Sequence, residues 1–179
     1  MPARIVLLRG INVGSANRIA MPALREALAE SGFGEARTYL QSGNILLDGD
    51  QAPDGLAASV ARLLSERFGL EVRVLARTVE ELVQVVARNP FPREAASNPK
   101  LLQVTFRDEA VQPDALTGLS ARAAPREKVA ASGREIYSWH PDGIARSKLA
   151  LALTPGGGAA TARNWTTVTT LLGMATDGD

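Results

Sequence analysis

Two short runs of consecutive apolar residues constrain the fold of this chain more than any other feature. They occupy residues 5–8 and residues 45–47, with no polar residue inside either run. A strand made of such a run needs cover on both faces, so we expect both runs to be central strands of a sheet. Residues 36–41 and 72–77 instead alternate between apolar and polar side chains, which is typical of edge strands.

Two helical segments separate these strands. Residues 21–31 place Leu24 and Leu28 on one stripe, and residues 54–68 carry a similar apolar face. The resulting order, β-α-β-β-α-β, is that of the ferredoxin-like arrangement, in which the first and third strands are central. We therefore predict that residues 1–77 form one ferredoxin-like half.

A connecting segment follows at residues 78–99. Its first part, residues 78–88, is predicted to be a helix that starts with a capping box between Thr78 and Glu81. Residues 89–99 contain three prolines and several small polar residues, so we expect a linker there.

Residues 100–179 repeat the same plan more loosely. Strands are expected at residues 100–107, 128–131 and 135–139, and helices at 112–119, at 146–153 and from about 164 onward. A final strand is not visible, and residues 154–158 are expected to form a mobile loop. The predicted fold class is α+β, with two ferredoxin-like halves, the second degenerate, and a C-terminal helix.

Composition excludes several kinds of chemistry. The chain has no cysteine, which rules out disulfides, thiolate catalysis and cysteine-based zinc sites. Its net charge of +1 disfavours a dedicated nucleic-acid partner without excluding one. No secretory segment and no membrane-spanning run is visible, so we expect a cytoplasmic protein with no membrane partner, no metal and no cofactor. The oligomeric state stays open.

Four short motifs carry a family resemblance. Residues 7–14 (LLRGINVG), 38–44 (TYLQSGN), 89–91 (NPF) and 163–168 (RNWTTV) resemble the bacterial domain of unknown function 1697 family, in this order and over nearly the whole chain. The resemblance implies a fold and a set of signature residues, but no reaction. The chain departs from the family pattern at Ser15 and Ala16, where Gly followed by a basic residue is frequent, and at Thr170, where Lys is common.

The predicted topology brings two of these motifs to one end of the sheet. In a ferredoxin-like half, the loop after the first strand and the turn between the second and third strands lie at the same end. We expect a two-residue turn at Ser42 and Gly43, and a helix whose N-terminus near Met21 favours an anion at this end. Arg163, beside another helix start, is suited to anion binding or to an ion pair, and Asn164 to an N-cap. The predicted ligand-binding residues are Arg9, Asn12, Gln41, Ser42, Asn44, Arg163 and Asn164.

Our leading hypothesis is a binding module for a small anionic ligand, phosphate-bearing or nucleotide-like. A structural alternative is that the asparagines and glycines of these motifs only satisfy or bend the loop backbone. A second alternative is a metal-independent enzyme that uses Tyr39, Ser42 or Lys148 as proton donor, nucleophile or base. A protein-interaction module is a third. Whether the chain is an enzyme is left open.

Two further features have plainer interpretations. Tyr137 and Trp139 share one face of a strand, where packing is favoured over base stacking because no basic RNA-recognition motif accompanies them. His140 is the single histidine, which excludes a zinc site built from several histidines. A Ser-His-Asp triad through His140 is disfavoured, since residues 141–143 look like a turn.

Overall fold

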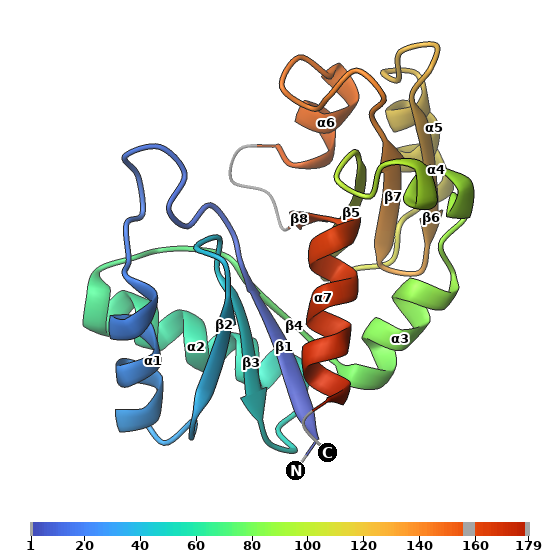
Figure 1. Ribbon diagram of the computed structural model, residues 1–179. Coiled ribbons are helices and arrows are strands. Elements are labelled where there is room, and N and C mark those ends of the chain that lie inside the picture. Colours follow the sequence, from blue (N-terminus) through green and yellow to red (C-terminus); the bar gives the residue numbers. More distant parts are fainter. Residues whose placement is uncertain (1, 156–159, 178–179) are drawn as a thin grey trace. The chain divides into compact units, whose positions relative to one another are not determined.

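The computed structural model describes residues 2–155 and 160–177, which form two four-stranded antiparallel sheets with helices (Figure 1). The first half contains β1 (Ala3–Leu8), α1 (Met21–Glu30), β2 (Ala36–Tyr39), β3 (Asn44–Asp48), α2 (Pro53–Phe68) and β4 (Val74–Thr78). Two helices follow, α3 (Val79–Ala87) and α4 (Pro92–Ser97). The second half contains β5 (Leu102–Arg107), α5 (Pro113–Ser120), β6 (Lys128–Ser132), β7 (Glu135–Trp139), α6 (Lys148–Leu153), β8 (Ala160–Asn164) and α7 (Trp165–Thr176).

The first sheet has the strand order β2-β3-β1-β4, so the two continuous apolar runs form the central strands, as predicted. Every residue of β1 is buried. Val6 and Leu8 on β1 pack with Leu24 of α1 and Leu64 of α2 in one core, which places both helices on the same face of the sheet. The burial of these apolar side chains is the main favourable contribution to the stability of this half.

The turn between β2 and β3 is longer than expected. Tyr39 pairs with Asn44, so residues 40–43 form a four-residue connection, and the predicted two-residue turn is wrong. The Asn44 amide donates to the Tyr39 carbonyl and thereby closes the longer turn. Gly43 follows β1 closely: its carbonyl accepts from the Leu8 N–H at 2.8 Å, and an added Cβ would lie 2.6 Å from the Leu8 Cβ. With φ at +78°, only glycine fits this position.

The second sheet has the order β6-β7-β5-β8 and therefore the same topology as the first. The expectation of a missing last strand is wrong, because β8 pairs antiparallel with β5. The sequence of β8, ATARN, consists of small and polar residues and carries little strand signal. The second half is degenerate in its helices instead: α5 and α6 have 8 and 6 residues, against 10 and 16 in α1 and α2. In the predicted mobile loop at 154–158, residues 156–158 lie outside the described residues.

The connecting segment is more structured than a linker. The predicted capping box is confirmed: the Glu81 N–H donates to the Thr78 hydroxyl at 3.1 Å, and the Thr78 N–H donates to the Glu81 carboxylate at 2.9 Å. Within the proline-rich stretch, Pro92 starts the short helix α4, where proline is tolerated because the first turn needs no N–H partner.

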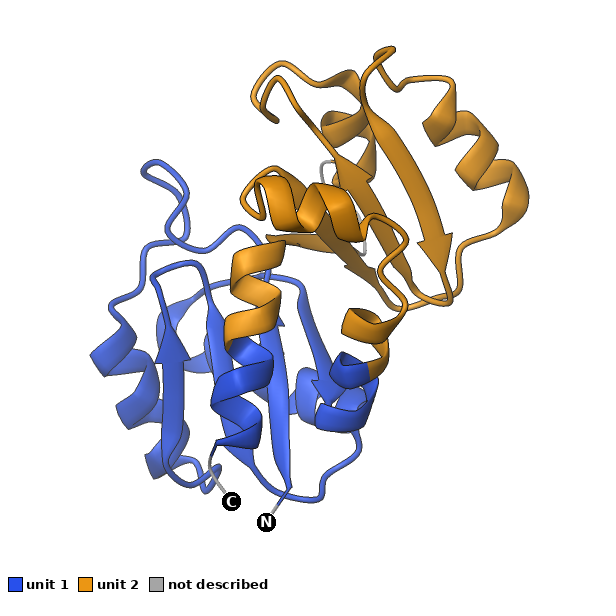
Figure 2. Cartoon of the chain, turned by 45° about the vertical axis from the view of Figure 1, so that its right-hand side comes forward, with its two compact units in different colours: residues 1–83, 171–179 blue, residues 84–170 orange. Residues whose placement is uncertain are grey.

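The chain divides into two compact units (Figure 2). Unit 1 comprises Met1–Val83 and Leu171–Asp179, and unit 2 comprises Gln84–Thr170. Helix α3 therefore starts in unit 1 and ends in unit 2, whereas α7 starts in unit 2 and ends in unit 1. Within the described residues, no helix combines the length and apolar character needed to cross a membrane.

Candidate functional site

The loop between β1 and α1, residues 9–20, folds back on itself. The Asn12 N–H donates to the Asn17 carbonyl at 3.1 Å, and the Ala16 N–H donates to the Val13 carbonyl at 3.2 Å. Asn12 and Asn17 both have positive φ, a conformation that asparagine tolerates better than most residues. The loop extends past the end of the first sheet, on the side where the β2–β3 turn lies (Figure 1).

The Asn12 side chain ties this loop to the turn. Its amide nitrogen donates to the Gln41 carbonyl at 2.8 Å and to the Ile19 carbonyl at 2.9 Å, while its oxygen accepts from the Ile19 N–H at 2.9 Å. The structure thus brings two predicted site residues, 29 positions apart, into direct contact. Because both amide hydrogens are used, Asn12 acts here as a clamp on the backbone.

Asn44 has a similar role inside the turn. It is fully buried, and its amide donates to the Tyr39 carbonyl at 3.0 Å and to the Ser42 hydroxyl at 3.1 Å. Buried polar groups must find such partners, since an unmade hydrogen bond is costly away from water. These hydrogen bonds explain why asparagine occupies both positions: half-buried Asn12 and fully buried Asn44 shape the site.

We define the unit 1 rim as residues 9–20 together with residues 40–43. Its two charged residues are Arg9 and Arg18, and it contains no acidic residue. Arg9 is half-buried, whereas Arg18, Gln41 and Ser42 are exposed. The N-cap of α1 is Ala20, whose side chain cannot accept from the free N–H groups of the first turn. The rim is consequently an electropositive end of the sheet.

One further arginine beside the rim was missed by the sequence analysis. Arg73 is exposed, and its carbonyl accepts from the Arg9 N–H at 2.9 Å. The register of β1 and β4, in which Leu8 pairs with Val74, puts it there. The available signal was the place of Arg73 at the start of the predicted edge strand 72–77, which runs antiparallel to the first strand and so begins where the first strand ends.

Arg163 and Asn164 belong to unit 2. Arg163 is 8% exposed and donates to the Thr161 hydroxyl and to the Ala162 carbonyl, both at 2.8 Å. Burial lowers the pKa of Arg163 to about 10. Asn164 is the N-cap of α7: its side-chain oxygen accepts from the Thr167 N–H at 2.9 Å.

The same arrangement recurs in unit 1. Arg77 on β4 is 2% exposed and donates to the carbonyl of the preceding residue at 2.9 Å, as Arg163 does. Arg77 pairs with Ile5 on β1, and Arg163 pairs with Val104 on β5, at corresponding register positions. In both units, the next residue caps the following helix. A buried arginine at this place is therefore a repeated feature of the fold.

The comparisons with known proteins agree with this architecture. The family model described as "Protein of unknown function (DUF1697)" matches residues 1–137. The chain belongs to this family. The solved structure of the conserved bacterial protein SP0830 from Streptococcus pneumoniae is similar to it, with a TM-score of 0.76 at 18% identity over 97% of this chain and 98% of that chain. At that identity the likeness shows the fold alone. No curated protein matches the chain.

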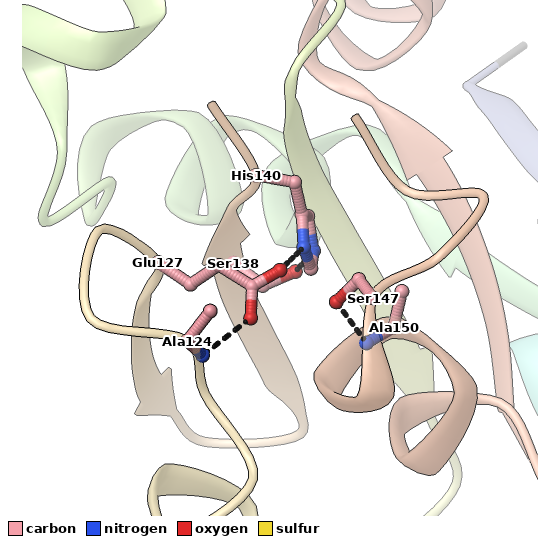
Figure 3. Close-up of polar contacts among 6 residues, drawn as sticks. All are labelled: Ala124, Glu127, Ser138, His140, Ser147 and Ala150. Atoms are coloured by element: carbon pink, nitrogen blue, oxygen red, sulfur yellow. Dashed lines mark hydrogen bonds and ion pairs between the residues drawn. The ribbon is translucent and has the colours of Figure 1, made fainter. Parts of the chain in front are cut away.

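This member of the DUF1697 family also contains a buried polar network in unit 2 (Figure 3). The Glu127 carboxylate lies 2.8 Å from His140 Nδ1, and the Ser138 hydroxyl lies 2.8 Å from His140 Nε2. Ser138 and His140 are fully buried, and the Glu127 side chain is 7% exposed. The connectivity is that of a Ser-His-Glu triad. Since a substrate cannot reach a fully buried hydroxyl, we interpret the network as a structural latch.

Several groups hold the Glu127 carboxylate in its charged form. Burial raises its pKa, but hydrogen bonds from the Ser147 hydroxyl and the Ala124 N–H, together with His140, outweigh burial, so the pKa lies below its ordinary value. The Ala124 N–H donates to Glu127 at 2.8 Å, and Ser147 also caps α6 by accepting from the Ala150 N–H at 2.9 Å (Figure 3). The latch thus joins the turn before β6 to the start of α6.

Sequence reasoning considered His140 but not its partners. Ser138 and His140 are two positions apart, so strand alternation already placed them on one face. Glu127 lies 13 positions away in a turn, and nothing local points to it. Asp142, the acidic residue nearest His140 in sequence, pairs with Arg126 instead.

The other residues considered for catalysis or stacking have structural positions. Tyr137 is buried and its hydroxyl donates to the Val85 carbonyl at 2.7 Å, so it offers no surface for a base. Burial raises the pKa of Tyr137 above its ordinary value. Tyr39 ends β2, and Lys148 starts α6 after its Ser147 cap. Among the described residues, no group of three acidic or histidine side chains could hold a metal ion.

Proposed function

We propose that this chain binds a small anionic ligand, phosphate-bearing or nucleotide-like, at the unit 1 rim. The observation that carries the proposal is the Asn12 clamp, whose 2.8 Å bond to Gln41 joins two loops that together carry arginines and no carboxylate. The proposal includes a cytoplasmic location.

The residues divide into two roles. Arg9 supplies charge, and Gln41 and Ser42 supply hydrogen bonds from an exposed turn. Asn12 and Asn44 hold the turn of Gln41 and Ser42 in place, so that little conformational entropy of the turn is lost when a ligand binds. The first turn of α1, which follows Ile19 closely, adds N–H groups and the positive end of its dipole.

Arg163 and Asn164 are left out of the proposed contact set. The hydrogen bonds of Arg163 to Thr161 and Ala162 explain its buried position, and the cap of α7 explains Asn164.

Isothermal titration with phosphate-bearing compounds tests the proposal. The panel contains inorganic phosphate, ribose 5-phosphate and adenosine 5′-monophosphate, titrated into the wild-type chain, Arg9→Ala and Arg62→Ala. Arg62 is an exposed arginine on α2 and serves as the matched control for loss of one positive charge. We expect Arg9→Ala to weaken binding at least tenfold, in line with a charge-assisted hydrogen bond, and Arg62→Ala to leave it unchanged. If the three chains bind these ligands with equal affinity, the rim is ruled out as the binding site.

A further inference from the structure

One residue of the unit 1 rim has a backbone conformation that its side chain disfavours. Leu40, the first residue of the turn, has φ at +58°. Among the described residues other than glycine, positive φ occurs at Asn12, Asn17 and Leu40. Asparagine adopts the left-handed region readily, whereas a bulky apolar residue there is an outlier. The two asparagines therefore need no special explanation, and the leucine does.

Burial does not compensate Leu40 for this conformation. The residue is 57% exposed, so its side chain gains little from the hydrophobic effect. Glycine or asparagine would satisfy the same turn at lower conformational cost. Strained positions of this kind concentrate at functional sites, and an observed outlier is a valid starting point for a functional hypothesis.

A second exposed apolar residue lies at the same rim. Val13 is 67% exposed and follows Asn12 directly, just as Leu40 directly precedes Gln41. The 2.8 Å bond from the Asn12 amide to the Gln41 carbonyl therefore has one exposed apolar residue beside each of its ends. Single exposed apolar residues are ordinary, but here two of them share a rim with Arg9 and Arg18.

We infer that Val13 and Leu40 contact the flat face of a heteroaromatic ring of the ligand, which makes the ligand class an anion with a planar base, that is, a nucleotide. This inference rests on the proposed function and narrows it. The rim offers positive charge for a phosphate and two apolar side chains for the face of a base. Ligand pockets combine apolar contact with a few polar groups in this manner.

Leu40→Asn separates a binding role from a structural one. Asparagine tolerates the left-handed conformation, so we expect the thermal unfolding midpoint of the variant to stay the same or rise. The variant loses the apolar contact, so we expect its affinity for adenosine 5′-monophosphate to fall about tenfold, the effect of removing a partly buried leucine from an interface. Affinity for ribose 5-phosphate should not change. Leu151→Asn, at a leucine that is 75% exposed on α6, is the matched control.

Titrations of both ligands into wild type, Leu40→Asn, Leu151→Asn and Arg9→Ala distinguish the outcomes. Support requires that wild type prefer adenosine 5′-monophosphate over ribose 5-phosphate and that only Leu40→Asn, without loss of stability, remove this preference. Equal binding of the two ligands to wild type, or an unchanged preference in Leu40→Asn, would overturn the inference while leaving the proposed function intact. If neither ligand binds wild type, or if Arg9→Ala leaves the affinities unchanged, both the inference and the proposed function are overturned.

Discussion

The two halves of the chain share one topology but differ at one end of their sheets. In unit 1 the first strand and first helix are joined by residues 9–20, whereas residues 108–112 make the corresponding connection in unit 2. The hairpin turns differ likewise: residues 40–43 in unit 1 and residues 133–134 in unit 2. The longer unit 1 loop carries arginines without acids, and the shorter unit 2 loop contains Asp108 and Glu109 without a basic residue.

The corresponding ends of the two sheets share one backbone hydrogen bond. The Leu8 N–H donates to the Gly43 carbonyl in unit 1, and the Arg107 N–H donates to the Arg134 carbonyl in unit 2. Beyond that point, unit 1 joins loop and turn through the Asn12 side chain, whereas unit 2 does so through a backbone bond from Val111 to Gly133. A repeated scaffold can thus carry an elaborated end in one copy, and a specific activity is expected at that end.

The largest expected effect concerns Gly43, which lies close to the Leu8 side chain. Gly43→Ala places a Cβ 2.6 Å from the Leu8 Cβ and also forces alanine to positive φ, so we expect a loss of about 3 kcal/mol in the free energy of unfolding. Gly133→Ala is the control: Gly133 also has a positive φ, +61°, but the atom nearest to an added Cβ is a Glu135 carboxylate oxygen at 4.0 Å. We expect a loss of about 1 kcal/mol there. Denaturant unfolding measures both, and equal losses would contradict the close approach.

A smaller effect is expected from Asn12→Ala. The substitution removes two hydrogen bonds to Ile19, two residues before α1, and one to the turn, at a partly exposed position. We expect a loss of about 2 kcal/mol, together with faster hydrogen exchange in residues 9–20. Because unit 2 makes the equivalent connection through its backbone, its exchange should stay unchanged in the same variant. Uniform acceleration across both units would show that Asn12 is not a local clamp.

The smallest expected effect is the pH dependence of the stability of unit 2. The pKa of Glu127 is lowered in the folded chain, so its contribution to stability is present above the ordinary value of 4.5 and is lost as the pH falls through the lower folded value. The wild-type thermal midpoint should therefore fall more steeply below pH 4.5 than that of Glu127→Gln, which has no carboxyl group to titrate at this position. Parallel curves would show that the charge of Glu127 does not support the fold.

Most of the fold could be predicted from the sequence, because strands and helices that bury apolar side chains show a recognisable pattern of apolar residues along the chain. The runs at residues 5–8 and 45–47 marked the central strands, and the Thr78–Glu81 capping box marked the start of α3. Strand β8 shows no such pattern of apolar residues. It is an edge strand of small and polar residues, and its partner, β5, is distant in sequence. Pairing over such a distance depends on the assembled sheet.

The candidate site was predictable in its location but not in the roles of its residues. Chain direction alone predicted that the loop of Asn12 and the turn of Gln41 lie at one end of the sheet. That the amides of Asn12 and Asn44 are occupied by backbone carbonyls depends on side-chain orientation, which no pattern in the sequence encodes. The positive φ of Leu40 was equally invisible, since leucine gives no turn signal.

The path of α3 and α7 has a consequence for any attempt to produce the halves separately. A fragment cut in the proline-rich stretch, such as residues 1–99, would lack the end of α7 and with it the contact of the Arg37 guanidinium with the Met174 carbonyl. Its complement would lack the end of α3, where Tyr137 finds its acceptor. Each piece would lack a part of its own compact unit, so we expect neither to fold alone as it does in the whole chain.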